Sequence, residues 1–142
     1  MATVNTALRT EHPALAFLLR VVIVVLTVAT AAIHASLGGL LFTLNAIGYT
    51  TLAASMVIPG PIAQVRWLVR LALLAFTAAT IGGWILFGAR FPLAYIDKGV
   101  EVVLVAFLAF EIWLVDGGPL GVARRIHRSV AGFADTFARG RP

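Results

Sequence analysis

The sequence predicts an all-α integral membrane protein: a bundle of four transmembrane helices with a C-terminal amphipathic surface helix. Of its 142 residues, 61% are hydrophobic and only 12% are charged, whereas soluble domains are about 45–50% apolar and about 25% charged. Four apolar stretches of about 20 residues each have the length that a helix needs to cross a bilayer. We therefore expect one transmembrane domain, residues 1–116, and one basic tail, residues 117–142.

The first two predicted spans form a hairpin. The first covers about residues 15–35, and Pro13 stands where the first turn of a helix tolerates proline. A signal peptide is the competing interpretation, because the small residues from Ala29 to Ala35 could be a cleavage site, but we expect the segment to be retained as a span. The second span covers about residues 40–58, after a very tight connection.

The third and fourth predicted spans cover about residues 67–88 and 93–115. Pro59 and Pro61 end the second span, since proline cannot extend a helix and disfavours helix in the residue before it. The fourth span follows a short connection that ends at Pro92. The chain contains no cysteine, which excludes disulfides, thiolate metal sites and thiol nucleophiles.

The distribution of basic residues predicts the orientation. Lysine and arginine are enriched in the cytoplasmic connections of membrane proteins. If both termini lie on one side, that side holds nine of the eleven basic residues, against Arg90 and Lys98 on the other. We therefore expect both termini to be cytoplasmic, in a prokaryotic-type inner membrane. The nine are Arg9, Arg20, Arg66, Arg70, Arg124, Arg125, Arg128, Arg139 and Arg141.

The fourth span carries an acidic stripe. Asp97, Glu101, Leu104, Leu108 and Glu111 follow one another at steps of four and three, which places them on one face of a helix. At 1.5 Å per residue, Glu101 lies roughly 12 Å inside the start of the span, and Glu111 lies about 27 Å along it. We therefore expect Glu101 to be deep and Glu111 to lie near the cytoplasmic interface, at most half-buried.

The ionisable side chains fall into two layers. Arg20, Arg66, Arg70, Glu111 and Asp116 are expected near the cytoplasmic ends of their spans, and the other charges of the spans near the opposite side. The layers are consistent with structural ion pairs that hold the helices together, with an ion or proton path, or with docking to a partner subunit. The candidate polar network comprises His34, Asn45, Tyr49, Arg90, Asp97, Lys98, Glu101 and Glu111.

Two further patterns concern helix contacts. Threonines lie at broadly similar depths in the first and third spans, and we expect them to hydrogen-bond between helices: Thr27, Thr30, Thr77 and Thr80. Small residues recur every four positions and predict two seams where helices approach closely: Ala31, Ala35 and Gly39, and Ala75, Ala79 and Gly83.

No motif indicates catalysis or a cofactor. His34 is the only histidine inside a span, so a bis-histidine haem site lacks its second ligand. Phosphate-binding loops, metal-binding helix motifs and nucleophile elbows are also missing from the sequence. We expect no catalytic residue, no metal and no cofactor, and hence no enzyme.

The tail predicts a basic amphipathic helix. Its apolar stripe comprises Val122, Ile126, Val130, Phe133 and Phe137. The arginines lie mostly off this stripe, where they could contact anionic lipid headgroups, although a helix that docks to a partner would have the same pattern. These membrane-surface basic residues are Arg124, Arg125, Arg128 and Arg139.

These patterns lead to two hypotheses about function. The first is a non-catalytic subunit, or an assembly or scaffold component, of a larger membrane complex. The alternative is a homo-oligomeric channel or an ion- or proton-coupled transporter that uses the stripe of Asp97 and Glu101. The expected partners are membrane lipids and either other membrane subunits or copies of the chain; nucleic acid is not expected.

Overall fold

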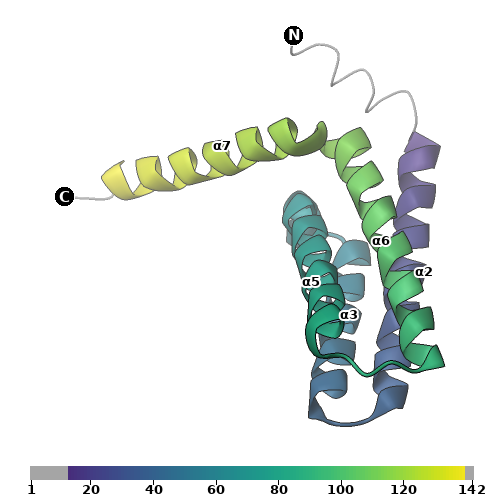
Figure 1. Cartoon of the computed structure of the whole chain (residues 1–142). Coiled ribbons are helices and arrows are strands. Elements are labelled where there is room, and N and C mark those ends of the chain that lie inside the picture. Colours follow the sequence, from purple (N-terminus) through teal and green to yellow (C-terminus); the bar gives the residue numbers. More distant parts are fainter. Residues whose placement is uncertain (1–12, 140–142) are drawn as a thin grey trace.

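The computed structural model describes residues 13–139, with side chains as far as residue 131, and this part of the chain is helical with short connections and no strand. The predicted all-α class is confirmed. The helices, shown in Figure 1, are α2 (Pro13–Leu37), α3 (Leu40–Val57), α4 (Pro61–Gln64), α5 (Arg66–Phe87), α6 (Pro92–Asp116) and α7 (Gly118–Arg139).

Three of these helices, α2, α3 and α5, are long and apolar enough to cross a membrane. Length and composition therefore support a membrane protein. Helix α6 has 25 residues, as many as α2, but it carries more charged side chains and is therefore not among the three helices that are apolar enough to cross a membrane. A fourth crossing by α6 stays a prediction.

Glycines form the sharp changes of direction. Between α2 and α3, Gly38 and Gly39 have φ angles of 70° and 83°, a region that side chains with a Cβ rarely occupy. Gly117 ends α6 in the left-handed conformation, with φ 77° and ψ 29°. The first pair permits the tight hairpin, and Gly117 lets α7 leave the bundle in a new direction, as Figure 1 shows.

Four helices form the bundle. Helix α2 packs against α3 and α6, and α5 packs against α6 and α3. The start of α2 and the end of α6 lie at the same end of the bundle, and α7 extends away from that end (Figure 1). The fully buried apolar side chains at the centre are Ile23, Met56, Leu73, Leu104 and Leu108.

Most small residues of the two predicted seams are not buried within the described part of the chain. Ala31 is buried, but the other five residues of the two seams are exposed. Helix α5 turns a different face inward, which carries Arg70, Leu73 and Thr77. Because each residue rotates the helix by about 100°, the stripe that begins at Ala75 points away from that face.

Candidate functional site

Helix α6 supplies the charged side chains of the site from one inward face. Asp97, Glu101, Leu104, Leu108 and Glu111 are all buried, so the predicted stripe is confirmed. The outward side of the same helix is apolar and exposed, with Val102, Val103, Phe110 and Trp113. The sequence thus separates the charges of α6 from its outer surface.

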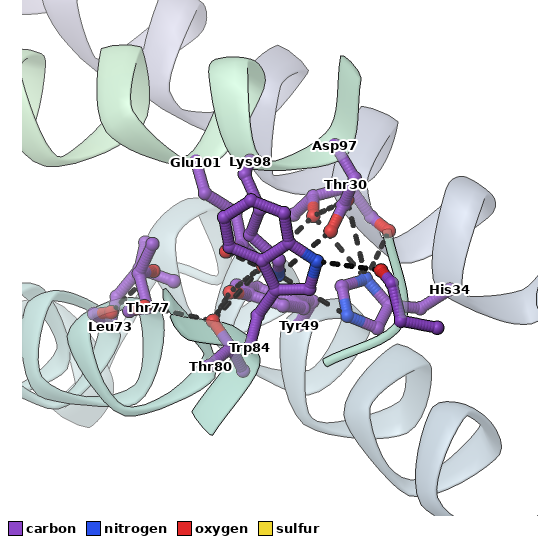
Figure 2. A network of polar contacts seen from close by, with 11 residues as sticks. Thr30, His34, Tyr49, Leu73, Thr77, Thr80, Trp84, Asp97, Lys98 and Glu101 are labelled. Carbon is purple, nitrogen blue, oxygen red and sulfur yellow. Dashed lines mark hydrogen bonds and ion pairs between the residues drawn. The ribbon is translucent and has the colours of Figure 1, made fainter. Parts of the chain in front are cut away.

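A group of polar side chains meets at one end of the bundle, and we call it the polar site. It includes residues of α2, α3, α5 and α6 (Figure 2). The Lys98 ammonium lies between two carboxylates, 2.6 Å from Glu101 Oε2 and 2.9 Å from Asp97 Oδ2. The members of the polar site are Thr30, His34, Tyr49, Thr80, Asp97, Lys98 and Glu101.

Hydroxyl groups from the other three helices donate to these carboxylates. Tyr49 Oη lies 2.8 Å from Glu101 Oε1, and Thr80 Oγ1 lies 3.0 Å from the same oxygen. Thr30 Oγ1 donates to Asp97 Oδ1 over 2.6 Å. Both buried carboxylates therefore accept hydrogen bonds from neighbouring helices, as buried polar groups require.

His34 is 2% exposed and contacts both acids loosely. Its Nδ1 lies 3.0 Å from the backbone oxygen of Thr30, a contact that requires a proton on Nδ1. Its Nε2 lies 3.9 Å from Glu101 Oε1, too far for a hydrogen bond. In the neutral ring with its proton on Nδ1, Nε2 is therefore an acceptor that faces a carboxylate.

The charges of the polar site do not balance. Two carboxylates face one ammonium, which leaves one net negative charge when His34 is neutral. Uptake of one proton by the ring makes the site neutral. An unmatched charge is costly in a buried site.

The same group has the geometry of a metal site. Ligand atoms of His34, Asp97 and Glu101 lie within 4.8 Å of one another. However, Lys98 Nζ already lies within 2.9 Å of one oxygen of each carboxylate, and the oxygens that face His34 accept hydrogen bonds from hydroxyl groups. The donor set is therefore better suited to a proton than to a metal, and we assign no metal here.

A pocket of about 410 Å³ lies beside the polar site. Its polar lining comprises His34, Asn45, Thr80, Asp97 and Lys98. The remaining lining is apolar and rich in aromatic rings, among them Phe42, Phe76, Trp84, Phe87 and Phe91. His34 and Asp97 therefore border the space of the pocket.

A second charged group, the arginine cluster, lies toward the other end of the bundle. Arg70 forms a two-bond pair with Asp116, from Nε over 2.9 Å and from Nη2 over 2.8 Å. Arg125 of α7 lies 3.2 Å from Asp116, so it also fixes the junction between α6 and α7. Glu111 is held loosely, 3.5 Å from Arg70 Nη1 and 4.0 Å from Arg20 Nε.

The expected exposure of Glu111 is wrong, because this side chain is completely buried. Arg70 and Arg20 lie next to its carboxylate. The start of α7 packs over this end of the bundle, with Val122 in a buried cluster that contains Trp67 and Ile112. The linear position of Glu111 along α6 did not reveal this cover.

Arg90 is not part of the polar site. It is exposed, donates to the backbone oxygen of Ile85 over 2.9 Å and lies 4.1 Å from the centre of the Trp84 ring. This corrects its assignment to the polar network. The aromatic ring and the backbone oxygen are nearer partners than the buried acids.

The threonine prediction is correct for two of the four residues. Thr30 and Thr80 bond to α6, whereas Thr27 and Thr77 donate to backbone oxygens of their own helices. Thr30 and Thr80 were missing from the predicted network. The spacing of four between Thr30 and His34 could have revealed the first, since it places both on one face.

The two charged groups are separated by an apolar layer. Leu104 and Leu108 lie on α6 between Glu101 and Glu111 and are fully buried. They pack with Ile23, Met56 and Leu73 of the neighbouring helices. The layer therefore separates the polar site and the pocket from the arginine cluster.

Comparisons of the chain with protein-family models, curated proteins and solved structures found no match.

Proposed function

We propose that the chain is an integral membrane protein of four spans, with α6 as the fourth and both termini on the cytoplasmic side. The support comes from the arrangement of α6, which buries its acids and Lys98 while it exposes Val102, Val103 and Phe110. Charged side chains within membranes face the bundle interior in this way. The nine-to-two distribution of basic residues supports the orientation.

Within this arrangement, we propose that the polar site exchanges protons as part of ion- or proton-coupled transport by a homo-oligomer. The observation that carries the proposal is the unmatched negative charge of the buried site, next to the open Nε2 of His34. The pocket brings water to this group from one side. A proton on His34 neutralises the site, and its loss restores the charge.

The apolar layer limits how the proton moves. Leu104 and Leu108 offer no donor or acceptor between Glu101 and Glu111, so a proton that enters from the pocket stops at the polar site in this arrangement. Transfer to the other side then requires a rearrangement of the helices or a path between copies. We propose that this arrangement corresponds to a state with access from one side.

The test is proton movement in liposomes that contain the purified chain and a pH-sensitive dye. We expect His34→Gln to abolish movement driven by an imposed potential, because glutamine cannot bind and release a proton. We expect Glu101→Gln to abolish it as well, because this change removes the unmatched negative charge and leaves Asp97 balanced by Lys98. Arg90→Gln is the control, since Arg90 lies outside the polar site. Wild-type liposomes without proton movement, or unchanged movement in both glutamine variants, would refute the proposal.

A second candidate function, a non-catalytic subunit of a membrane complex, is favoured by a different observation. Ala75, Ala79 and Gly83 of α5 form an exposed stripe of small residues, which permits close approach of a helix from another chain. Mass measurement after purification in mild detergent separates the two candidates. Foreign subunits in fixed ratio support the complex, whereas a uniform homo-oligomer supports the transporter.

Helix α7 is proposed to rest on anionic lipid. Ile126 and Val130 are exposed on its apolar side, and Arg124 and Arg128 are exposed as well. Arg125 is paired with Asp116, which removes it from the expected set of lipid contacts. The side chains of Arg139, Phe133 and Phe137 lie outside the described residues. Salt-dependent binding of a peptide of residues 118–139 to anionic vesicles tests this role.

A further inference from the structure

We propose that the pocket binds a neutral, flat, membrane-soluble ring with a hydrogen-bond-accepting oxygen, the chemistry of a quinone. The inference rests on the membrane placement proposed above and goes beyond proton exchange. Its volume of about 410 Å³ lies within the roughly 300–1,000 Å³ of pockets that enclose small organic molecules.

The walls of the pocket favour a ring. Aromatic side chains dominate the apolar lining, and flat rings stack on such surfaces or pack against their edges. Trp84 is fixed in its orientation, because its Nε1 donates to the oxygen of Ala89 over 3.1 Å and its ring meets Tyr95 edge-on at 5.2 Å. A preformed wall of this kind lowers the entropy lost on binding.

The polar lining favours an oxygen that accepts hydrogen bonds. Asn45 is half-buried in the lining and carries an amide that can donate. Lys98 has three N–H groups, and its two carboxylate partners use two of them. A carbonyl oxygen of the ligand can take the third, or the amide of Asn45.

Charge matching favours a neutral ligand. The ammonium of Lys98 is already shared by two carboxylates, and one proton completes the balance of the polar site. An anionic ligand would meet Asp97 in the lining, and a cationic ligand would meet Lys98. A neutral ring carries no charge that must lose its water on binding or that is repelled by Asp97 or Lys98.

The approach to the pocket is apolar. Leu41 and Phe87 belong to the lining and are 68% and 89% exposed. Ala79 and Gly83 also belong to the lining and are exposed on α5. In the proposed placement these surfaces face hydrocarbon, so a ligand dissolved in the membrane can enter without crossing water.

The test uses menadione, 2-methyl-1,4-naphthoquinone, and the full chain in detergent. Binding is followed as quenching of tryptophan fluorescence, and the part of the signal that Trp84→Phe removes reports on the pocket. The control ligand is 2-methylnaphthalene, which has the same ring without oxygens. We expect the Kd of 2-methylnaphthalene, measured by competition with menadione, to be at least ten-fold higher than the Kd of menadione.

Two adjacent glycines of α5 provide matched variants. A Cβ at Gly82 or at Gly83 meets nothing within 4 Å, so both positions accept a side chain, but only Gly83 belongs to the lining of the pocket. We expect Gly83→Leu to fill the pocket and raise the Kd for menadione at least ten-fold. Gly82→Leu should leave it unchanged within two-fold.

Three results would overturn the inference: no saturable quenching by menadione, equal competition by 2-methylnaphthalene, or equal Kd values in the two glycine variants. Tighter binding of 1-naphthoate or 1-naphthylmethylammonium would show a charged ligand class and would also overturn it. Proton movement is measured without any quinone. Proton movement in a protein that does not bind menadione would leave the proposed function intact and refute only this inference.

Discussion

The polar site and the arginine cluster are built on the same face of α6 but hold their acids differently. Glu101 accepts bonds of 2.6–3.0 Å from Lys98, Tyr49 and Thr80, which come from three helices. Glu111 is equally buried, but within the described residues its nearest basic nitrogens are 3.5 and 4.0 Å away and its Oε2 has no hydrogen-bond partner. Burial alone therefore does not show how well an acid is satisfied.

The difference lies in the donors. Hydroxyl groups and a short ammonium contact enclose Glu101 from several directions, whereas Glu111 meets only long guanidinium side chains. In the arginine cluster the short bonds go to Asp116, at the end of α6. The polar site thus fixes the helices around one carboxylate, and the arginine cluster joins α5, α6 and α7 through Arg70 and Asp116.

The largest effect is expected from Arg70→Leu. This change leaves Asp116 and Glu111 buried with less positive charge around them, and breaking a buried ion pair in this way costs about 3–5 kcal/mol. The free energy of unfolding in mixed micelles measures it. Arg90→Leu is the matched control, because an exposed arginine should change stability by about 0.5 kcal/mol or less. Similar losses of stability in both variants would show that the buried Arg70 contributes no more to stability than the exposed Arg90.

The next effect concerns Glu101→Gln. Glutamine loses the charge-assisted bond to Lys98, but Asp97 still lies 2.9 Å from that ammonium. We therefore expect a loss of about 1.5–3 kcal/mol, the range for hydrogen bonds to charged groups. The same unfolding measurement applies, and a neutral result would show that the short contacts of Glu101 contribute little.

A smaller effect is expected from Glu111→Gln, about 1 kcal/mol, because its contacts are longer than the roughly 2.7–2.9 Å of strong charged pairs. The comparison of the two glutamine variants is the sharpest test of the difference between the sites. If Glu111→Gln is the more destabilising of the two, the order proposed for the two acids is wrong.

The smallest effect separates Thr80 from Thr77. Thr80→Val removes a donor to Glu101 and should cost about 1 kcal/mol. Thr77→Val removes a bond to the oxygen of Leu73 in its own helix rather than a bond to a carboxylate, and it should cost less. Equal losses would argue against a distinct role for the hydroxyl groups of the polar site.

Much of the fold could be predicted from the sequence, because hydrophobic runs and proline positions determine where helices begin and end. The acidic stripe was predictable for the same reason, since the spacing of Asp97, Glu101 and Glu111 fixes one face. The two layers of charge also followed from position along the helices, with Arg90 as the exception.

The remaining features depend on how helices rotate and pack against one another. The small residues of α5 did not show which side of this helix is exposed. The inward face instead carries Arg70 and Thr77, which are both buried. The burial of Glu111 depends on the arginines that pack beside it from α2 and α5. The pocket depends on the directions of aromatic side chains such as Trp84.

The apolar layer has a consequence for membrane voltage. Ten residues of helix separate Glu101 from Glu111, which is about 15 Å, or half of the roughly 30 Å hydrocarbon core. Because most of the membrane voltage falls where water is excluded, a proton that reaches His34 from the pocket would have crossed only part of the field. The work of moving one charge, about 2.3 kcal/mol per 100 mV, is then concentrated at Leu104 and Leu108.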